Sequence, residues 1–100
     1  MVRHIILWKL KDTIPAEDVP AVKAGIKESL EALPAVIDGL VELKVHTEGL
    51  PSSNCDLMLE SLLRDEAALN EYGDHPAHVA AADGFVRPNT AVRLCLDFEV

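Results

Sequence analysis

The segment VRHIILWKL, residues 2–10, constrains the fold more than any other part of this 100-residue chain. It is short and rich in β-branched and large apolar side chains, which predicts a strand. Alternation places His4 and Trp8 on one face of that strand and Ile5 and Leu7 on the other. Both faces are substantially apolar and unsuited to water. We therefore expect a sheet with helices on one face and a second protein surface on the other.

Two further regions have apolar residues at helical spacing. The first runs from Asp18 to Leu33 and ends before Pro34, because a proline disfavours the helical conformation in the residue that precedes it. In the second region, Asp65 is expected to cap a short helix that Gly73 ends. Pro76 then begins another helix, since its fixed φ suits the first helical turn.

The remaining strands are predicted at residues 40–46, 55–63 and 91–100. The order β-α-β-β-α-β is that of ferredoxin-like folds, in which the strands form an antiparallel sheet in the order 4-1-3-2 with both helices on one face. We therefore predict an α+β fold made of one domain, residues 1–100. Two open sheet faces packed together would give a dimeric α/β barrel. Ile5, Leu7 and Cys95 are expected on the open face.

Composition and charge exclude several classes of partner. Hydrophobic residues make up 49% of the chain, which favours an oligomer interface and therefore a homodimer. The net charge of −8, with nine Lys+Arg spread along the chain, argues against nucleic acid and against an anionic membrane. We see no signal peptide and no bilayer-spanning segment, and we expect a cytoplasmic protein. Cys55 and Cys95 fall in non-adjacent strands, so no disulfide is expected.

The HPAH motif, residues 75–78, holds two of the four histidines. His75 precedes Pro76 at a helix start, so structural roles are expected for both residues. A metal site would use His75 and His78 with an acid such as Asp74 or Asp83. No Glu-x-x-His partner or cysteine pair supports that reading, so we predict no metal.

The second histidine of the motif is the candidate catalytic residue. His78 shares a helix face with Ala82 and Phe85, and this face is expected to meet the sheet. Tyr72 lies where the chain enters the helix. A neutral histidine can take a proton from carbon next to a carbonyl, and a tyrosine hydroxyl can donate a hydrogen bond to the enolate oxygen. The alternative is that His78 only packs and satisfies a backbone carbonyl.

Four segments of the chain together resemble the stress-responsive A/B barrel (Dabb) family: VRHIILWKLKD, LPAVIDGL, YGDHPAH and LDFEV. The resemblance implies a ferredoxin-like protomer and a dimeric α+β barrel. Many members have no assigned activity, but a plant member closes a polyketide by aldol condensation without metal or organic cofactor. Its histidine and tyrosine match His78 and Tyr72, and a histidine in its first strand matches His4. Val22 stands where that cyclase has pocket aromatics.

Two functions are therefore carried forward. The first is a cofactor-independent enzyme acting on a small hydrophobic carbonyl compound, with His78 as general base and Tyr72 as its partner. Its pocket is expected to be lined by His4, Ile6, Trp8, Val22, Ala82 and Phe85. The second is a non-catalytic dimeric stress or stability protein that binds a small ligand or none. Fold analogy adds a cofactor-free monooxygenase or lactone isomerase. Arg87 and Arg93 are expected to pair with the acidic surface, with a substrate carboxylate as a second role for Arg93.

Overall fold

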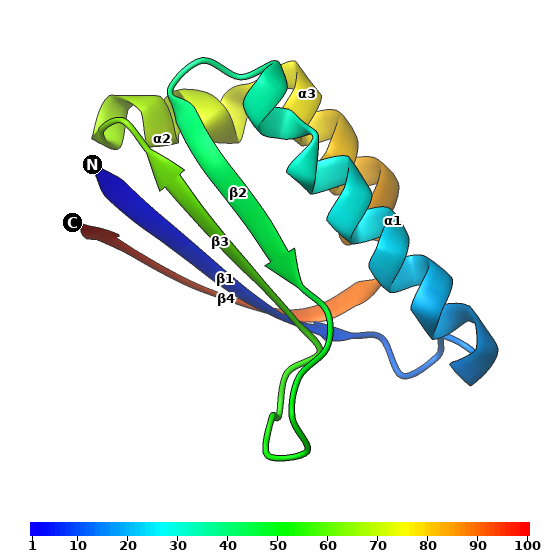
Figure 1. Cartoon of the computed structure of the whole chain (residues 1–100). Coiled ribbons are helices and arrows are strands. Elements are labelled where there is room, and N and C mark those ends of the chain that lie inside the picture. Colours follow the sequence, from blue (N-terminus) through cyan, green and yellow to red (C-terminus); the bar gives the residue numbers. More distant parts are fainter.

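Strand β1 (Val2–Leu10) lies inside a four-stranded antiparallel sheet in the computed structural model, which describes residues 1–100. It pairs with β3 (Leu57–Leu63) on one edge and with β4 (Thr90–Glu99) on the other. Strand β2 (Leu40–His46) pairs with β3 and forms the far edge (Figure 1). The order β2-β3-β1-β4 is the predicted order 4-1-3-2 read from the opposite edge, so the predicted fold is confirmed.

All helices lie on one side of this sheet (Figure 1). Helix α1 (Val19–Glu31) stands between two 3-10 turns, Ala16–Asp18 and Leu33–Ala35. The second helical region has three parts: α2 (Glu66–Asp74), α3 (Pro76–Ala81) and a π-helical turn (Ala82–Val86). The Asp65 carboxylate accepts a hydrogen bond of 2.8 Å from the Ala68 amide and so caps α2, as predicted. None of the helices has the length and apolarity needed to cross a membrane.

The break between α2 and α3 lies at His75. Helix α2 continues through Gly73 to Asp74, so the prediction that Gly73 ends it is wrong. His75 instead has an extended backbone, with φ −64° and ψ 132°, because the ring of Pro76 disfavours the helical conformation in the residue before it. The His75 Nδ1 accepts a hydrogen bond of 3.0 Å from the Ala77 amide, and this bond caps α3.

The core fills the space between the sheet and the helices. The even-numbered residues of β1 face this core as predicted, and Ile6 and Trp8 are 2% and 5% exposed. Helix α1 contributes Ile26 and Leu30, both almost wholly buried. Burying such side chains drives the helices onto this one face.

The opposite face of the sheet carries apolar side chains with nothing packed on them. Ile5 and Leu7 of β1 lie opposite Leu96 and Leu94 of β4. Leu94 and Leu96 are 57% and 66% exposed, and Phe98 on the same strand is 44% exposed. Isolated apolar residues on a surface are common, but a contiguous group of this kind marks an interaction surface. We call Ile5, Leu7, Leu94, Leu96 and Phe98 the open face.

Cys95 does not belong to the open face, and that prediction is wrong. It lies opposite Ile6 in the register of β1 and β4, and its Sγ is 3.9 Å from Nδ1 of His4 on the helix side. Successive strand residues alternate between faces, so Cys95 must point away from its neighbours Leu94 and Leu96. Both Cys55 and Cys95 are free thiols.

Gly39 is expected to tolerate no side chain. Its φ is +83°, and a Cβ there would lie 2.8 Å from the Cβ of Ala68. We predict that Gly39→Ala lowers the free energy of unfolding by about 2 kcal/mol, through backbone strain and overpacking. Gly73→Ala in α2 is the matched control, because a Cβ there meets no atom within 4 Å, and it should raise stability slightly. Urea unfolding at fixed protein concentration compares the two, and equal effects would contradict this account.

Candidate active site

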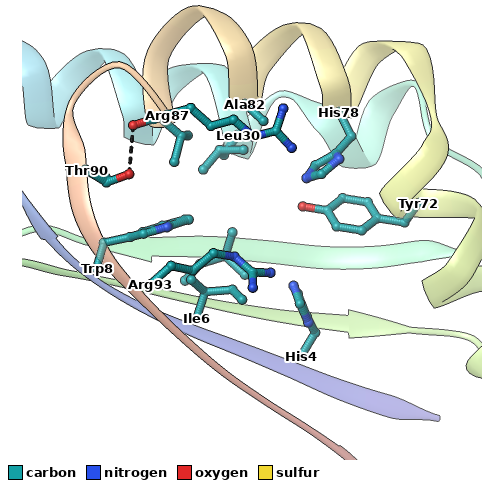
Figure 2. A pocket seen from close by; sticks show the side chains of 12 residues that line it. His4, Ile6, Trp8, Leu30, Tyr72, His78, Ala82, Arg87, Thr90 and Arg93 are labelled. Carbon is teal, nitrogen blue, oxygen red and sulfur yellow. Dashed lines mark hydrogen bonds between the residues drawn. The ribbon is translucent and has the colours of Figure 1, made fainter.

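A cavity of about 300 Å³ lies between the sheet and the second helical region. Half of its wall is apolar and comes from both layers, namely Ile6, Trp8, Leu30, Leu59, Ala82 and Val86. Pockets that bind small molecules are of this size and combine apolar walls with a few polar groups. The cavity stands where the sequence predicted one, between the strand that carries His4 and the helix that carries His78 (Figure 2).

Two residues predicted to line the cavity lie outside it. Phe85 is 45% exposed, and its Cδ1 lies 3.2 Å from the position of a Cβ on Gly25 of α1. The prediction that Phe85 faces the sheet is wrong because the helix widens there. The Arg87 amide bonds to the Ala82 carbonyl five residues earlier, at 2.8 Å, and this π-helical turn brings Val86 inward instead.

Val22 packs against the core but does not line the cavity. Leu30, two turns further along α1, takes that position. Helical spacing places both residues on the inner face of the helix and does not indicate which turn meets the cavity.

The other half of the wall consists of polar side chains without a single carboxylate: His4, Tyr72, His78, Arg87, Thr90 and Arg93. Thr90 was not among the residues singled out from the sequence. Arg87 and Arg93 were assigned mainly to the acidic surface, yet both extend into the cavity (Figure 2). The alternation of β4 could have indicated that Arg93 points to the helix side, because Arg93 shares a strand face with Cys95 and Asp97 and not with the apolar residues.

A backbone carbonyl determines which nitrogen of the neutral His78 ring carries the hydrogen. Its Nδ1 lies 3.1 Å from the carbonyl oxygen of Gly73. A carbonyl can only accept a hydrogen bond, so Nδ1 must carry the hydrogen, and Nε2 of the neutral ring is left with a free lone pair. In a continuous helix the Ala77 amide would occupy the Gly73 carbonyl, but here that amide bonds to His75. The cap of α3 therefore leaves the Gly73 carbonyl to His78.

The surroundings of His78 favour the neutral ring. Burial lowers the pKa of His78 below its ordinary value of 6.5, because a charged imidazolium is disfavoured away from water. The hydrogen bond to Gly73 raises this pKa, and the positive charges of Arg87 and Arg93 lower it again. At neutral pH the base form of His78 therefore predominates.

Tyr72 stands between the two histidines of the cavity and is 3% exposed. Its ring centroid lies 4.3 Å from that of His78 and 5.9 Å from that of His4, the latter edge-on. Its hydroxyl points into the cavity (Figure 2). It forms no hydrogen bond within the protein, but it is accessible from the cavity and not sealed in the core. Burial raises the pKa of Tyr72 to about 12, so the hydroxyl stays protonated and available as a donor.

His4 is held by a carboxylate on the neighbouring strand. Its Nδ1 pairs with Asp97, which lies opposite His4 in β4.

His4, Cys95 and Asp97 form the one cluster of potential metal ligands in the chain. Cys95 Sγ is 3.6 Å from both carboxylate oxygens of Asp97. Burial and the charge of Asp97 raise the pKa of the Cys95 thiol, and a protonated thiol is a poor ligand. His75 and His78 do not belong to this cluster.

The sequence as a whole now identifies the family. The profile of the stress responsive A/B barrel domain matches residues 2–100. The chain belongs to the stress-responsive A/B barrel (Dabb) family. A curated relative, an uncharacterised protein of Streptomyces coelicolor, is 37% identical over 82 residues, or 80% of this chain and 81% of that protein. The family resemblance inferred from the four segments is thus confirmed.

Solved structures of similar sequence are dimeric. A dimeric protein of unknown function with a ferredoxin-like fold from Bacteroides fragilis is 33% identical, has a TM-score of 0.91, and is matched over 99% of this chain and 95% of that one. A dimeric ferredoxin-like protein of unknown function from Thermobifida fusca is 31% identical, with a TM-score of 0.79 and coverage of 99% and 90%. The family and fold of the chain are thus established, while its chemistry must be argued from the cavity.

Replacement of each HPAH histidine should separate a cap from a cavity wall. His75→Ala removes the acceptor of the Ala77 amide and should cost about 1 kcal/mol of unfolding free energy. His78→Ala should cost no more, because its ring borders a cavity and the Gly73 carbonyl remains open to water. Thermal and urea unfolding of both variants measure this difference. A clearly larger loss for His78→Ala would assign His78 a structural role.

Proposed function

We propose that this protein enolises a small hydrophobic carbonyl compound without a cofactor, in the manner of an aldol-forming cyclase, with His78 as general base and Tyr72 as hydrogen-bond donor. One observation carries the proposal: the free Nε2 of His78 and the Tyr72 hydroxyl, which forms no hydrogen bond within the protein, border the same cavity. A base beside a donor is what proton abstraction next to a carbonyl requires.

The reaction follows from the protonation states of the two groups. Nε2 of His78 takes a proton from the carbon next to the substrate carbonyl, and the electron pair of that C–H bond moves to form the enolate. Tyr72 donates a hydrogen bond to the enolate oxygen. The imidazolium formed at His78 keeps its Nδ1–H bond to Gly73, which favours the charged ring. The enolate then recovers a proton from His78 or attacks a second carbonyl carbon within the substrate. In the second case the C=O π electrons move to oxygen, and the resulting alkoxide takes the proton from His78.

Two solved structures of more distant sequence are compatible with catalysis on this fold. One is a hydroxynitrile lyase from Passiflora edulis, 19% identical with a TM-score of 0.74, and covered over 97% of this chain and 90% of that one. The other is a cofactor-independent oxygenase from Streptomyces nogalater, 14% identical with a TM-score of 0.75 and coverage of 99% and 91%. At these identities the likeness concerns the fold alone. A non-catalytic stability protein has no evident need for a cavity with a free base and donor.

Proton exchange next to a carbonyl tests the proposed reaction directly. We expect the protein to accelerate exchange of the α-protons of 2-hexanone or 4-oxohexanoate in D₂O, followed by ¹H NMR. His78→Ala should lose about 100-fold or more of the rate, because it removes the base. Tyr72→Phe should lose about 100-fold, because it removes the donor. His46→Ala, a histidine at the end of β2 that pairs with Glu60 away from the cavity, should leave the rate unchanged. Exchange by His78→Ala at the wild-type rate would refute the proposal.

The pH profile of 2-hexanone exchange gives a second readout. Because the neutral ring is the base and the pKa of His78 is lowered, the rate should fall with decreasing pH through a midpoint below 6.5. Ionisation of Tyr72 should cause no loss at mildly alkaline pH, since its pKa is about 12. A midpoint above 6.5 would be inconsistent with His78 as the base.

The open face supports a homodimer in which two sheets pack together as an α/β barrel. Leu94, Leu96 and Phe98 are exposed on the edge strand β4, and Ile5 and Leu7 of β1 lie opposite the two leucines, so the group is contiguous. Dimeric relatives at 33% and 31% identity are consistent with this arrangement. Burying such a surface is the ordinary driving force for a permanent dimer.

A charge placed on the open face should break the dimer. Leu96→Lys puts an ammonium group where the partner sheet would bury it without a counterion, so we expect a monomer of 10.9 kDa or an unfolded chain. Leu50→Lys is the matched control, because Leu50 is 76% exposed in the loop between β2 and β3. Sedimentation equilibrium should give twice the monomer mass for the wild type and the control. A wild-type monomer at micromolar concentration would disprove the dimer.

A further inference from the structure

Positive charge is concentrated at the cavity of an otherwise acidic protein. The chain has 17 Asp+Glu against nine Lys+Arg, yet no carboxylate lines the cavity. Two of the four arginines, Arg87 and Arg93, do line it. A negatively charged ligand would be repelled by the protein as a whole, so any attraction must come from these local groups.

Arg93 is the arginine without a carboxylate partner. Arg3 pairs with Glu42 on the other face of the sheet, and Arg64 pairs with acids outside the cavity. Arg93 forms no ion pair, and the acid that follows it on the same face of β4, Asp97, is engaged by His4. Its guanidinium points into the cavity (Figure 2). A guanidinium that faces a pocket without a carboxylate counterion is a site for an anion.

Arg87 reaches the cavity from the opposite layer. It lies just after the π-helical turn, whereas Arg93 projects from β4, so the two side chains approach from the helix and sheet sides (Figure 2). Arg87 also pairs with Asp83, one helical turn earlier, which neutralises part of its charge. We therefore assign the main contact to Arg93 and a supporting contact to Arg87.

The charges of both arginines affect the pKa values of the proposed reacting groups. Their charges lower the pKa of His78, and the charge of Arg93 also opposes the rise in the pKa of Tyr72. An anion held by Arg93 would therefore stand next to the base and the donor. Half of the wall is apolar, which suits the carbon chain of an organic acid better than a free inorganic anion.

We propose that the cavity takes a keto acid, with Arg93 binding the substrate carboxylate and His78 and Tyr72 facing the ketone. The choice of substrate class rests on the proposed enolisation. The anion site itself rests on the arginines and is tested by binding alone. A planar carboxylate accepts two parallel hydrogen bonds from one guanidinium, which would also fix the orientation of the ketone.

The binding test uses two probes that differ in charge, 4-oxohexanoate and 4-oxohexanamide. Isothermal titration should show wild-type protein binding the acid at least about 10-fold more tightly than the amide. Arg93→Gln should abolish this preference, because it should weaken binding of the acid about 10-fold more than binding of the amide. Arg64→Gln removes the same charge outside the cavity and should keep the preference. Equal affinities for the two probes in the wild type, or an unchanged preference in Arg93→Gln, would overturn the proposal.

A second measurement locates the bound anion. NMR titration of the imidazole of His78 should show a higher pKa with 4-oxohexanoate bound than with 4-oxohexanamide, because the carboxylate offsets the arginine charges. An identical pKa with both probes would place the acid elsewhere and contradict the proposal.

The binding and exchange experiments test the anion site and the enolisation separately. A preference for the acid that depends on Arg93, without α-proton exchange, would retain the anion site and reject enolisation. Exchange of 2-hexanone and 4-oxohexanoate with equal efficiency, and no preference for the acid in binding, would retain enolisation and reject the keto acid.

Discussion

Strand β1 is hydrogen-bonded along both edges and apolar on both faces, and the rest of the molecule is arranged around it. Its inner residues, such as Ile6 and Trp8, form the wall of the cavity. Its outer residues, Ile5 and Leu7, belong to the open face. A shift of one residue in its pairing would exchange these two sets, so a single register determines both the cavity wall and the open face.

The orientation of His78 in the cavity depends on a short break in a helix. Pro76 interrupts the helical ladder, and His75 then captures the Ala77 amide that the Gly73 carbonyl would otherwise bind. The freed carbonyl orients His78. The two histidines of the motif thus have complementary roles, since the His75 ring accepts a hydrogen bond from a backbone amide and the His78 ring donates one to a backbone carbonyl. Neither role requires a metal ion.

The fold could be read from the sequence because alternation and helical spacing are local patterns with a clear period. Strand β2 was predicted at its observed bounds, and β4 within one residue of them. Phe85 was misplaced because a π-helical turn has no recognisable spacing. Cys95 was misplaced although the alternation through Leu94 and Leu96 already assigned it to the other face. The role of Arg93 could not be settled, because charge in a sequence does not indicate which acids lie within reach.

The π-helical turn at Ala82–Val86 has a consequence for how this cavity differs among relatives. One residue advances an α-helix by about 100°, so the extra residue in the wide turn sets the direction of Arg87 by chain length rather than by side-chain identity. A related chain that is one residue shorter there would turn its arginine away from the cavity while keeping every residue type. In an alignment that change appears as a gap and not as a substitution, so the length of this turn and not only its residue types decides whether an arginine reaches the cavity.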